Sequence, residues 1–309
     1  MWESSLIRSE SHGYRELLKV ATPYLALSLT YASVVIVIEE LLGDRLYKNV
    51  GQIGSVFGIA VALFLGFRMN SAYDRWWEAR KVIGELNNTA TSFVCKICGY
   101  FGNPANVETN QLNCDNITED LVGLTRLYVE ALKNELLDGP KAELNELGQR
   151  HQLNVNHKLS NEIMLAITRR IEGTFAESRP IEKSDLMQHV NRFIDIQGRA
   201  ERIKNTPFLM IYSAFTRLIV LLYVLLIPFF LGDLDLGGEA SNWEYLALPI
   251  MAVISSIFLT INQLANLYGT PFADSMTSLP LAAICRQIDN RCAEMLGSKS
   301  GMITSERSP

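Results

Sequence analysis

Long apolar stretches alternate with charged stretches along the whole chain. Four of the apolar stretches carry at most one charged residue: Val20–Ile38, Asn49–Phe67, Asn205–Gly232 and Tyr245–Ala273. A helix needs about 20 mostly apolar residues to cross a bilayer, and each stretch reaches or approaches that length. The pattern therefore predicts four membrane-spanning helices.

The region between the second and third apolar stretches is charged and has helical periodicity. It predicts helices over Asp74–Cys98, Asp115–Leu137, Asn161–Ile171 and Lys183–Arg202. Three Gly- or Pro-containing breakers, at 102–104, 138–140 and 178–180, separate them. Ser184 and Asp185 are of the residue types that cap the start of a helix, so we expect them to cap the last one. No useful alternating strand pattern occurs, which predicts an all-α membrane protein.

These patterns predict a four-part organisation. Residues 1–80 hold the first two membrane helices, and the second of these runs through about 51–80. Residues 81–204 form a helical domain outside the membrane. Residues 205–273 hold the third and fourth membrane helices, and residues 274–309 form a C-terminal helix and tail.

The distribution of positive charge predicts the orientation in the membrane. Lys and Arg flank the apolar stretches on the N-terminal, middle and C-terminal sides, whereas the 233–244 loop has acidic residues and no Lys or Arg. The positive-inside rule then places both termini and the middle region in the cytoplasm. Arg45 and Lys48, in the first outer loop, oppose this assignment slightly. No cleavable signal peptide is expected.

One charged residue interrupts the third apolar stretch. Arg217 lies well inside it, where a charge is costly unless it meets water or a partner. Arg217 is therefore a functional candidate, although a long side chain of this kind also reaches the membrane surface readily.

The sequence contains no motif typical of an enzyme active site or a metal site. The sequence has no phosphate-binding or dinucleotide-binding glycine motif, and its four His are scattered. Cys95 and Cys98 form a C-x-x-C pair, with Cys114 as the nearest third thiol, whereas a structural zinc site uses four ligands. We expect packing cysteines, and no catalytic residue, metal or cofactor. The net charge of −5 gives no sign of a nucleic-acid partner.

The second apolar stretch carries a regular face. Ile59, Leu63 and Phe67 are four residues apart and so share one side of a helix, and this side continues into the polar residues Asn70, Ser71 and Asp74. Such a stripe usually marks helix packing or lipid contact. It also suits the lining of a pore that is apolar within the membrane and wet outside it.

Residues 58–80 contain Phe64-Leu65-Gly66-Phe67-Arg68 and Asn70-Ser71-Ala72-Tyr73-Asp74-Arg75-Trp76-Trp77. This segment resembles the pore-helix signature of the bestrophin family in its bacterial form. The resemblance extends more weakly over most of the chain. It implies a homopentameric ion channel of the bacterial inner membrane, with four membrane helices and a helical cytosolic domain in each subunit.

The resemblance also implies roles for individual residues. Ile59, Leu63 and Phe67 would form the hydrophobic neck, and Ile181, in Arg179-Pro180-Ile181, would form a second constriction in the cytosol. Further residues would line the pore mouth (Asn70, Ser71, Asp74) or hold the exit of the pore helix (Gly66, Arg75, Trp76, Trp77). Animal members bind calcium with several carboxylates after the fourth helix. Ala273–Thr277 offers only Asp274, so calcium gating is not expected.

The expected function is passive conduction of small monovalent ions. Anions such as chloride or bicarbonate are favoured and cations are an alternative: Arg68 and Arg75 would favour anions if they face the lumen, whereas Asp74 would favour cations. The partners expected are other copies of the chain, the lipid bilayer and the permeating ions. Two other classes stay open, a secondary transporter and a membrane-anchored signalling or scaffold protein.

Overall fold

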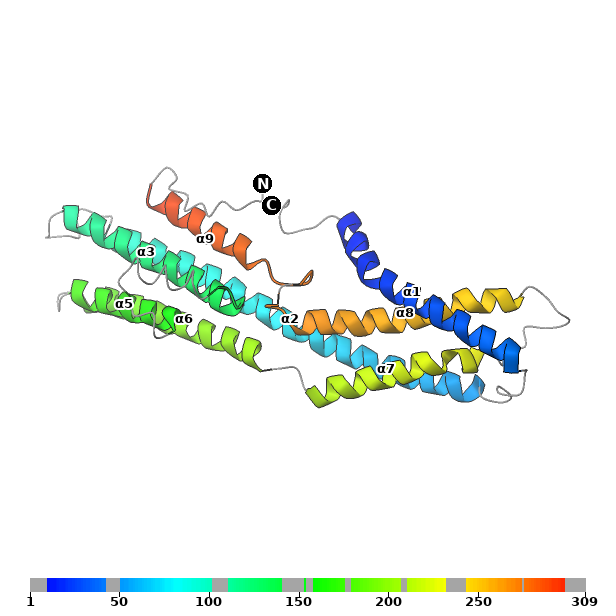
Figure 1. Ribbon diagram of the computed structural model, residues 1–309. Coiled ribbons are helices and arrows are strands. Elements are labelled where there is room, and N and C mark those ends of the chain that lie inside the picture. The colour runs from blue at the N-terminus through cyan, green and yellow to red at the C-terminus, as the bar shows by residue number, and fades with distance from the viewer. Residues whose placement is uncertain are drawn as a thin grey trace. The chain divides into compact units, whose positions relative to one another are not determined.

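The computed structural model describes residues 10–42, 51–101, 111–140, 153, 158–175, 179–206, 210–231, 243–273 and 275–297. Regular structure within these ranges is entirely helical (Figure 1). The helices are α1 (Glu10–Leu42), α2 (Gly51–Phe101), α3 (Gln111–Leu136), α5 (Leu159–Thr174), α6 (Pro180–Asn205), α7 (Met210–Leu231), α8 (Trp243–Gly269) and α9 (Leu281–Met295). The expected all-α fold is confirmed.

Four of these helices are long and apolar enough to cross a membrane. The qualifying segments are Gly13–Ile38, Ile53–Phe101, Met210–Phe230 and Leu248–Gly269, and each overlaps one of the four apolar stretches of the sequence. The second is part of α2, a single helix of 51 residues. The apolar stretch and the charged helix expected after it therefore form one continuous element.

The chain divides into two compact units. The first, here called the membrane unit, comprises Met1–Trp76, Pro207–Pro271 and Ser275–Ser278. The second, here called the helical unit, comprises Trp77–Thr206, Phe272–Asp274 and Leu279–Pro309. Helix α2 supplies its N-terminal half to the membrane unit and its C-terminal half to the helical unit.

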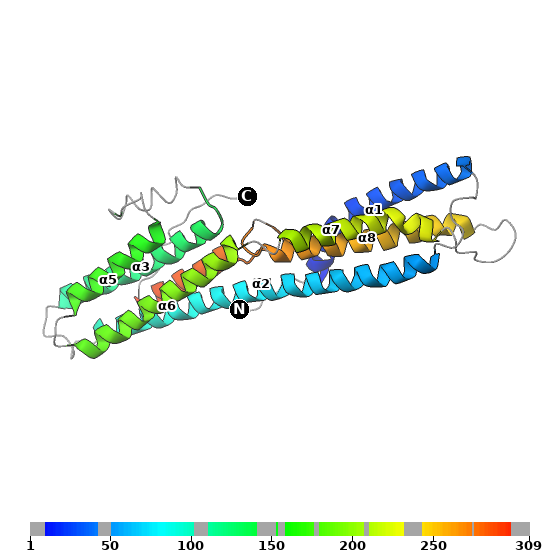
Figure 2. The ribbon, with the colours of Figure 1, turned by 90° about the horizontal axis from the view of Figure 1, so that it is seen from below.

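Helix α8 is the packing partner of both α1 and α7 in the membrane unit. Figures 1 and 2 show these helices side by side in two perpendicular views. One buried apolar cluster joins α2, α7 and α8: Val61, Leu65, Val220 and Leu259. A second joins α1, α7 and α8: Ala32, Ile227 and Met251.

Two glycines let α2 approach α7 closely. A Cβ atom added at Gly54 would lie 2.2 Å from Cγ of Phe230, and one added at Gly58 would lie 2.4 Å from the hydroxyl oxygen of Tyr223. Small residues allow close helix contacts of this kind in membranes, where dispersion contacts rather than water exclusion drive association. The rings of Phe230 and Tyr223 occupy the space that side chains would need.

The helical unit has its own core. Tyr128, Phe93 and Phe193 are fully buried, and their rings meet edge to face. The Tyr128 hydroxyl has one proton to donate, and two acceptors share it: the backbone oxygen of Phe193 at 3.1 Å and Oε1 of Gln197 at 3.3 Å. Gln197 in turn donates to Oδ1 of Asn161. Burial raises the pKa of Tyr128 far above its ordinary value, so it stays a neutral donor that satisfies buried polar groups.

The start of α6 differs from the expectation. The helix begins at Pro180, with Arg179 in the cap position and no side-chain cap, so Ser184 and Asp185 lie in its interior and are not caps. The reason is that proline at the first helical position has a preset φ and loses no hydrogen bond there. The helix therefore starts three residues earlier than the sequence pattern indicates.

The glycine contact generates a stability prediction. Gly54→Ala should destabilise the protein by about 1–3 kcal/mol, because the new methyl group must displace the Phe230 ring. The measurement is the apparent Tm of purified protein in detergent. Gly99→Ala is the matched control on the same helix, since a Cβ there meets nothing within 4 Å and alanine favours the helix. Equal Tm values for the two variants would contradict the proposed close packing.

Candidate functional site

One face of α2 within the membrane unit is uncovered. Ile59 is 72% exposed, Leu63 57% and Phe67 55%. Val56, about one turn nearer the helix start, and Ile53, nearly two turns nearer, are exposed as well. Exposure of large apolar side chains on this scale indicates contact with lipid, with another protein surface or with a pore.

The opposite face of α2 is packed. Val61, Leu65, Arg68 and Ala72 are almost completely buried, and their spacing of four, three and four residues follows the helical repeat. The contacts of this face with α7 and α8 determine the rotation of α2 about its axis. Ile59, Leu63 and Phe67 consequently all point away from the rest of the unit.

The uncovered face becomes polar after Phe67. Asn70, Ser71 and Asp74 are exposed, and the Ser71 hydroxyl donates to the backbone oxygen of Phe67 over 3.0 Å. Asp74 therefore offers a solvent-accessible carboxylate about two turns beyond Phe67. The exposed face of α2 thus changes from apolar to polar along the helix, as the sequence pattern predicts.

Arg68 does not lie on this face. It follows Phe67 directly, but consecutive helical residues are about 100° apart, and Arg68 is only 1% exposed. Its Nη1 atom donates to Oδ1 of Asn262, and its Nη2 atom donates to Oδ1 of Asn266. The condition stated for Arg68, that it would favour anions if it faces the lumen, is not met in this protomer, because α8 covers the side chain.

Sequence reasoning missed Asn262 and Asn266. A signal was present, because two amides four residues apart lie on one side of a membrane-length span that carries no charge. Arg217, which the sequence singled out, is exposed on α7.

Aromatic side chains surround the end of the membrane half of α2. The indole nitrogen of Trp76 donates to the backbone oxygen of Thr277 over 2.8 Å. Its ring stacks on Tyr73 and meets Tyr268 of α8 edge to face, with centroids 6.4 and 6.1 Å away. Trp76 thus ties α2 to the segment that follows α8. Trp77 is 46% exposed.

The remaining two residues expected at this exit differ in their surroundings. A Cβ added at Gly66 would meet nothing within 4 Å, so no neighbouring group in the described protomer requires glycine there. Arg75 is half-buried. Neither arrangement by itself assigns a function to the residue.

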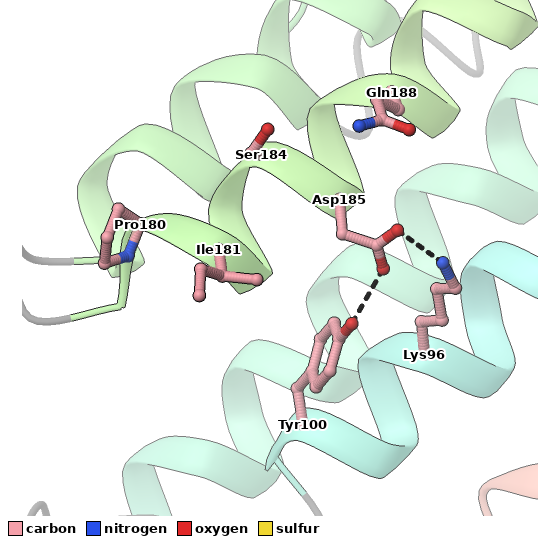
Figure 3. Close-up of a pocket in the computed structure, with 7 residues that line it drawn as sticks. All are labelled: Lys96, Tyr100, Pro180, Ile181, Ser184, Asp185 and Gln188. Carbon is pink, nitrogen blue, oxygen red and sulfur yellow. Dashed lines mark hydrogen bonds and ion pairs between the residues drawn. The ribbon is translucent and has the colours of Figure 1, made fainter.

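Ile181 lies in the first turn of α6 and is 80% exposed. It borders an open pocket of about 530 Å³ together with Lys96, Tyr100, Pro180, Ser184, Asp185 and Gln188. Figure 3 shows the Asp185 carboxylate between Lys96 and Tyr100 of α2, both of which donate to it. These two donors, Lys96 foremost, lower the pKa of Asp185, so its carboxylate stays ionised at neutral pH.

The described cysteines differ in their surroundings: Cys285 and Cys292 are buried, Cys98 is half-buried and Cys95 is exposed. Burial raises the pKa of Cys285 to about 12 and that of Cys292 to about 11. Within the described ranges, no group of three or more His, Cys, Asp or Glu side chains is arranged to hold a metal ion. Asp274, the one carboxylate of the segment compared with the animal calcium site, lies outside the described residues.

A family model described as Bacterial/Fungal Bestrophin protein matches residues 15–294. The chain belongs to the bestrophin family. The expected resemblance is confirmed by this match over most of the chain. Bestrophin membership also supports the all-helical membrane fold and gives no indication of enzyme activity.

Two similar proteins carry names that refer to anion channels. The voltage-dependent anion channel-forming protein YneE of Salmonella typhimurium is 28% identical over 244 residues, which cover 76% of this chain and 73% of YneE. The voltage-dependent anion channel-forming protein alr2987 of Nostoc is 27% identical over 249 residues, covering 77% and 76%.

Solved structures show the same fold. A bacterial bestrophin homologue from Klebsiella pneumoniae superposes with a TM-score of 0.74 at 24% identity, covering 90% of this chain and 98% of the homologue. A second structure of the Klebsiella homologue, which carries a point mutation, gives a TM-score of 0.73 at 25% identity, covering 89% and 98%.

The contacts of Trp76 predict a structural role. Trp76→Ala should destabilise the protein by about 2 kcal/mol, since two ring contacts are lost from a half-buried site. Trp76→Phe should cost about 1 kcal/mol, because it keeps a ring and loses the hydrogen bond to Thr277. The apparent Tm and the yield of assembled protein on size exclusion measure both effects.

A second measurement separates structure from conduction. The reversal potential of any current in a salt gradient should be the same for Trp76→Phe and for the natural protein. A stable, fully assembled Trp76 variant with altered ion preference would contradict the structural role.

Proposed function

We propose that this bestrophin forms a homopentameric channel that conducts small monovalent ions across the bacterial inner membrane, with anions such as chloride or bicarbonate favoured. The observation that carries the proposal is the uncovered face of α2. Three large apolar side chains stay exposed while the opposite face of the same helix is fully packed. The names of the curated relatives support the preference for anions.

The neck would consist of five copies of Ile59, Leu63 and Phe67. An ion passing such a ring loses water and gains no polar ligand, so the barrier depends on whether the constriction is wet. The ring edge of Phe67 carries partial positive charge and can meet an anion. Asn70, Ser71 and Asp74 would then line the wet mouth beyond the neck.

Ile181 would form a second constriction within the cytosolic part of the channel. Its 80% exposure in the protomer leaves it accessible to neighbouring subunits or to a lumen. Both termini and the helical unit would lie in the cytoplasm, following the Lys and Arg distribution. The four predicted sequence regions, 1–80, 81–204, 205–273 and 274–309, would then correspond to membrane, cytosolic, membrane and cytosolic parts.

Bilayer recording tests the function. The purified full-length protein in planar bilayers should give unitary currents, which passive channels produce and secondary transporters or scaffold proteins do not. Reversal potentials in a chloride gradient should report the preferred sign of the ion. An assembled protein without unitary currents would contradict the proposal.

The neck assignment has its own test. Replacing Ile59, Leu63 and Phe67 together with Ala should raise unitary conductance by about twofold or more, because a wider ring is wetted more readily. The matched control replaces Leu218, Leu221 and Leu225 with Ala, three exposed apolar residues of α7. The control should leave conductance unchanged. A correctly assembled neck variant with the natural conductance would rule out this face of α2 as the constriction.

A further inference from the structure

Arg68 places a positive charge directly behind the proposed neck. It adjoins Phe67 in the chain, yet it faces the interior of the membrane unit, where it is 1% exposed. A guanidinium remains charged under all ordinary conditions. The side chain thus carries a full charge inside the wall of the proposed pore, at the level of the last neck residue.

The partners of Arg68 satisfy its hydrogen bonds without cancelling its charge. Asn262 and Asn266 each accept one bond through a neutral amide oxygen. They are one turn apart on α8 and so present both acceptors on the same side of that helix. An Asp at either position would have supplied the same geometry and neutralised the guanidinium.

No carboxylate in the described part of the chain forms an ion pair with Arg68. Its two hydrogen-bond partners on α8 are uncharged amides. Charge interactions extend further in apolar surroundings than in water, because the effective dielectric constant is lower. The field of Arg68 therefore reaches beyond its own helix, because the groups that bind its guanidinium do not neutralise it.

We propose that Arg68 is a selectivity-determining residue that favours anions over cations through space, while Asn262 and Asn266 hold it in place without neutralising it. This inference rests on the proposed channel function, because it needs five copies arranged around a neck. An ion at the level of Phe67 would experience a ring of five buried positive charges. It would touch only the apolar side chains.

The first test changes the charge of Arg68. Reversal potentials give the chloride-to-sodium permeability ratio of the full-length protein in planar bilayers. Arg68→Gln should lower this ratio by about threefold or more, whichever ion the natural protein prefers. Arg68→Lys keeps the charge and should leave the ratio within about twofold of the natural value.

The second test keeps Arg68 and neutralises it in place. Asn262→Asp preserves the acceptor oxygen and adds a compensating charge, so it should lower the ratio in the same direction as Arg68→Gln. A purely structural role of Arg68 would not predict this change, since an ion pair holds α2 to α8 at least as well. This variant also keeps the proposal testable if Arg68→Gln fails to assemble.

Two controls separate the buried charge from charges on the surface. Arg170→Gln removes the same charge from an exposed residue of the helical unit, which pairs with Asp120, and it should not change the ratio. The effect of Asn262→Asp should persist at 1 M salt, where the Debye length is about 3 Å and exposed charges are screened. An effect lost at 1 M salt would assign the preference to exposed charges and overturn the proposal.

The experiments distinguish an error in the role of Arg68 from an error in the proposed channel function. If the natural protein gives no unitary currents, the proposed function itself is wrong. If the natural protein conducts and the neck variant raises conductance, but Arg68→Gln and Asn262→Asp leave the permeability ratio unchanged, only the role of Arg68 is wrong.

Discussion

The close contact between α2 and α7 is the constraint on which the candidate site depends. Gly54 and Gly58 bring the backbone of α2 against the rings of Phe230 and Tyr223. Because a helix resists twisting about its axis, this contact fixes the directions of the side chains along the membrane half of α2. Ile59, Leu63 and Phe67 are left uncovered for that reason, and Arg68 is turned toward α8.

The charged residues in the two halves of α2 have different kinds of partners. In the described membrane half, the one deeply buried charge is Arg68, and it is held by two neutral amides. In the helical unit, charged residues of α2 pair with opposite charges on α6, as Glu85 does with Arg199 and Glu78 with Arg202. These pairs are partly exposed and so contribute little stability each, whereas the buried Tyr128 network gives the unit a specific polar core.

Much of the fold could be predicted from the sequence because membrane helices leave a strong signal in composition. Four apolar stretches of membrane length correspond to four membrane-length helices, and the helical spacing of Ile59, Leu63 and Phe67 predicted a shared face. Periodicity could not say whether that face is covered. The answer depends on which side of α2 contacts α7. That side is set by Gly54 and Gly58, and their role can be recognised only in the folded structure, where Phe230 and Tyr223 lie against them.

Other features depend on contacts between residues far apart in the chain. Arg68 and Asn262 are 194 positions apart, and nothing local to Arg68 indicates that its partners are amides. The start of α6 was misplaced for the opposite reason. Ser184 and Asp185 have strong local preferences for a cap, but Pro180 begins the helix earlier, and Asp185 is used instead to receive hydrogen bonds from Lys96 and Tyr100.

The use of Asp185 has a mechanical consequence for Ile181. The two residues are one turn apart on α6, and the carboxylate attaches that turn to α2 through two donors. These bonds hold the backbone of the first turns of α6, so the position from which the exposed Ile181 side chain projects is fixed. If Ile181 forms a constriction as we propose, the width of that constriction would depend on the size of the side chain at this position and not on movement of the helix end.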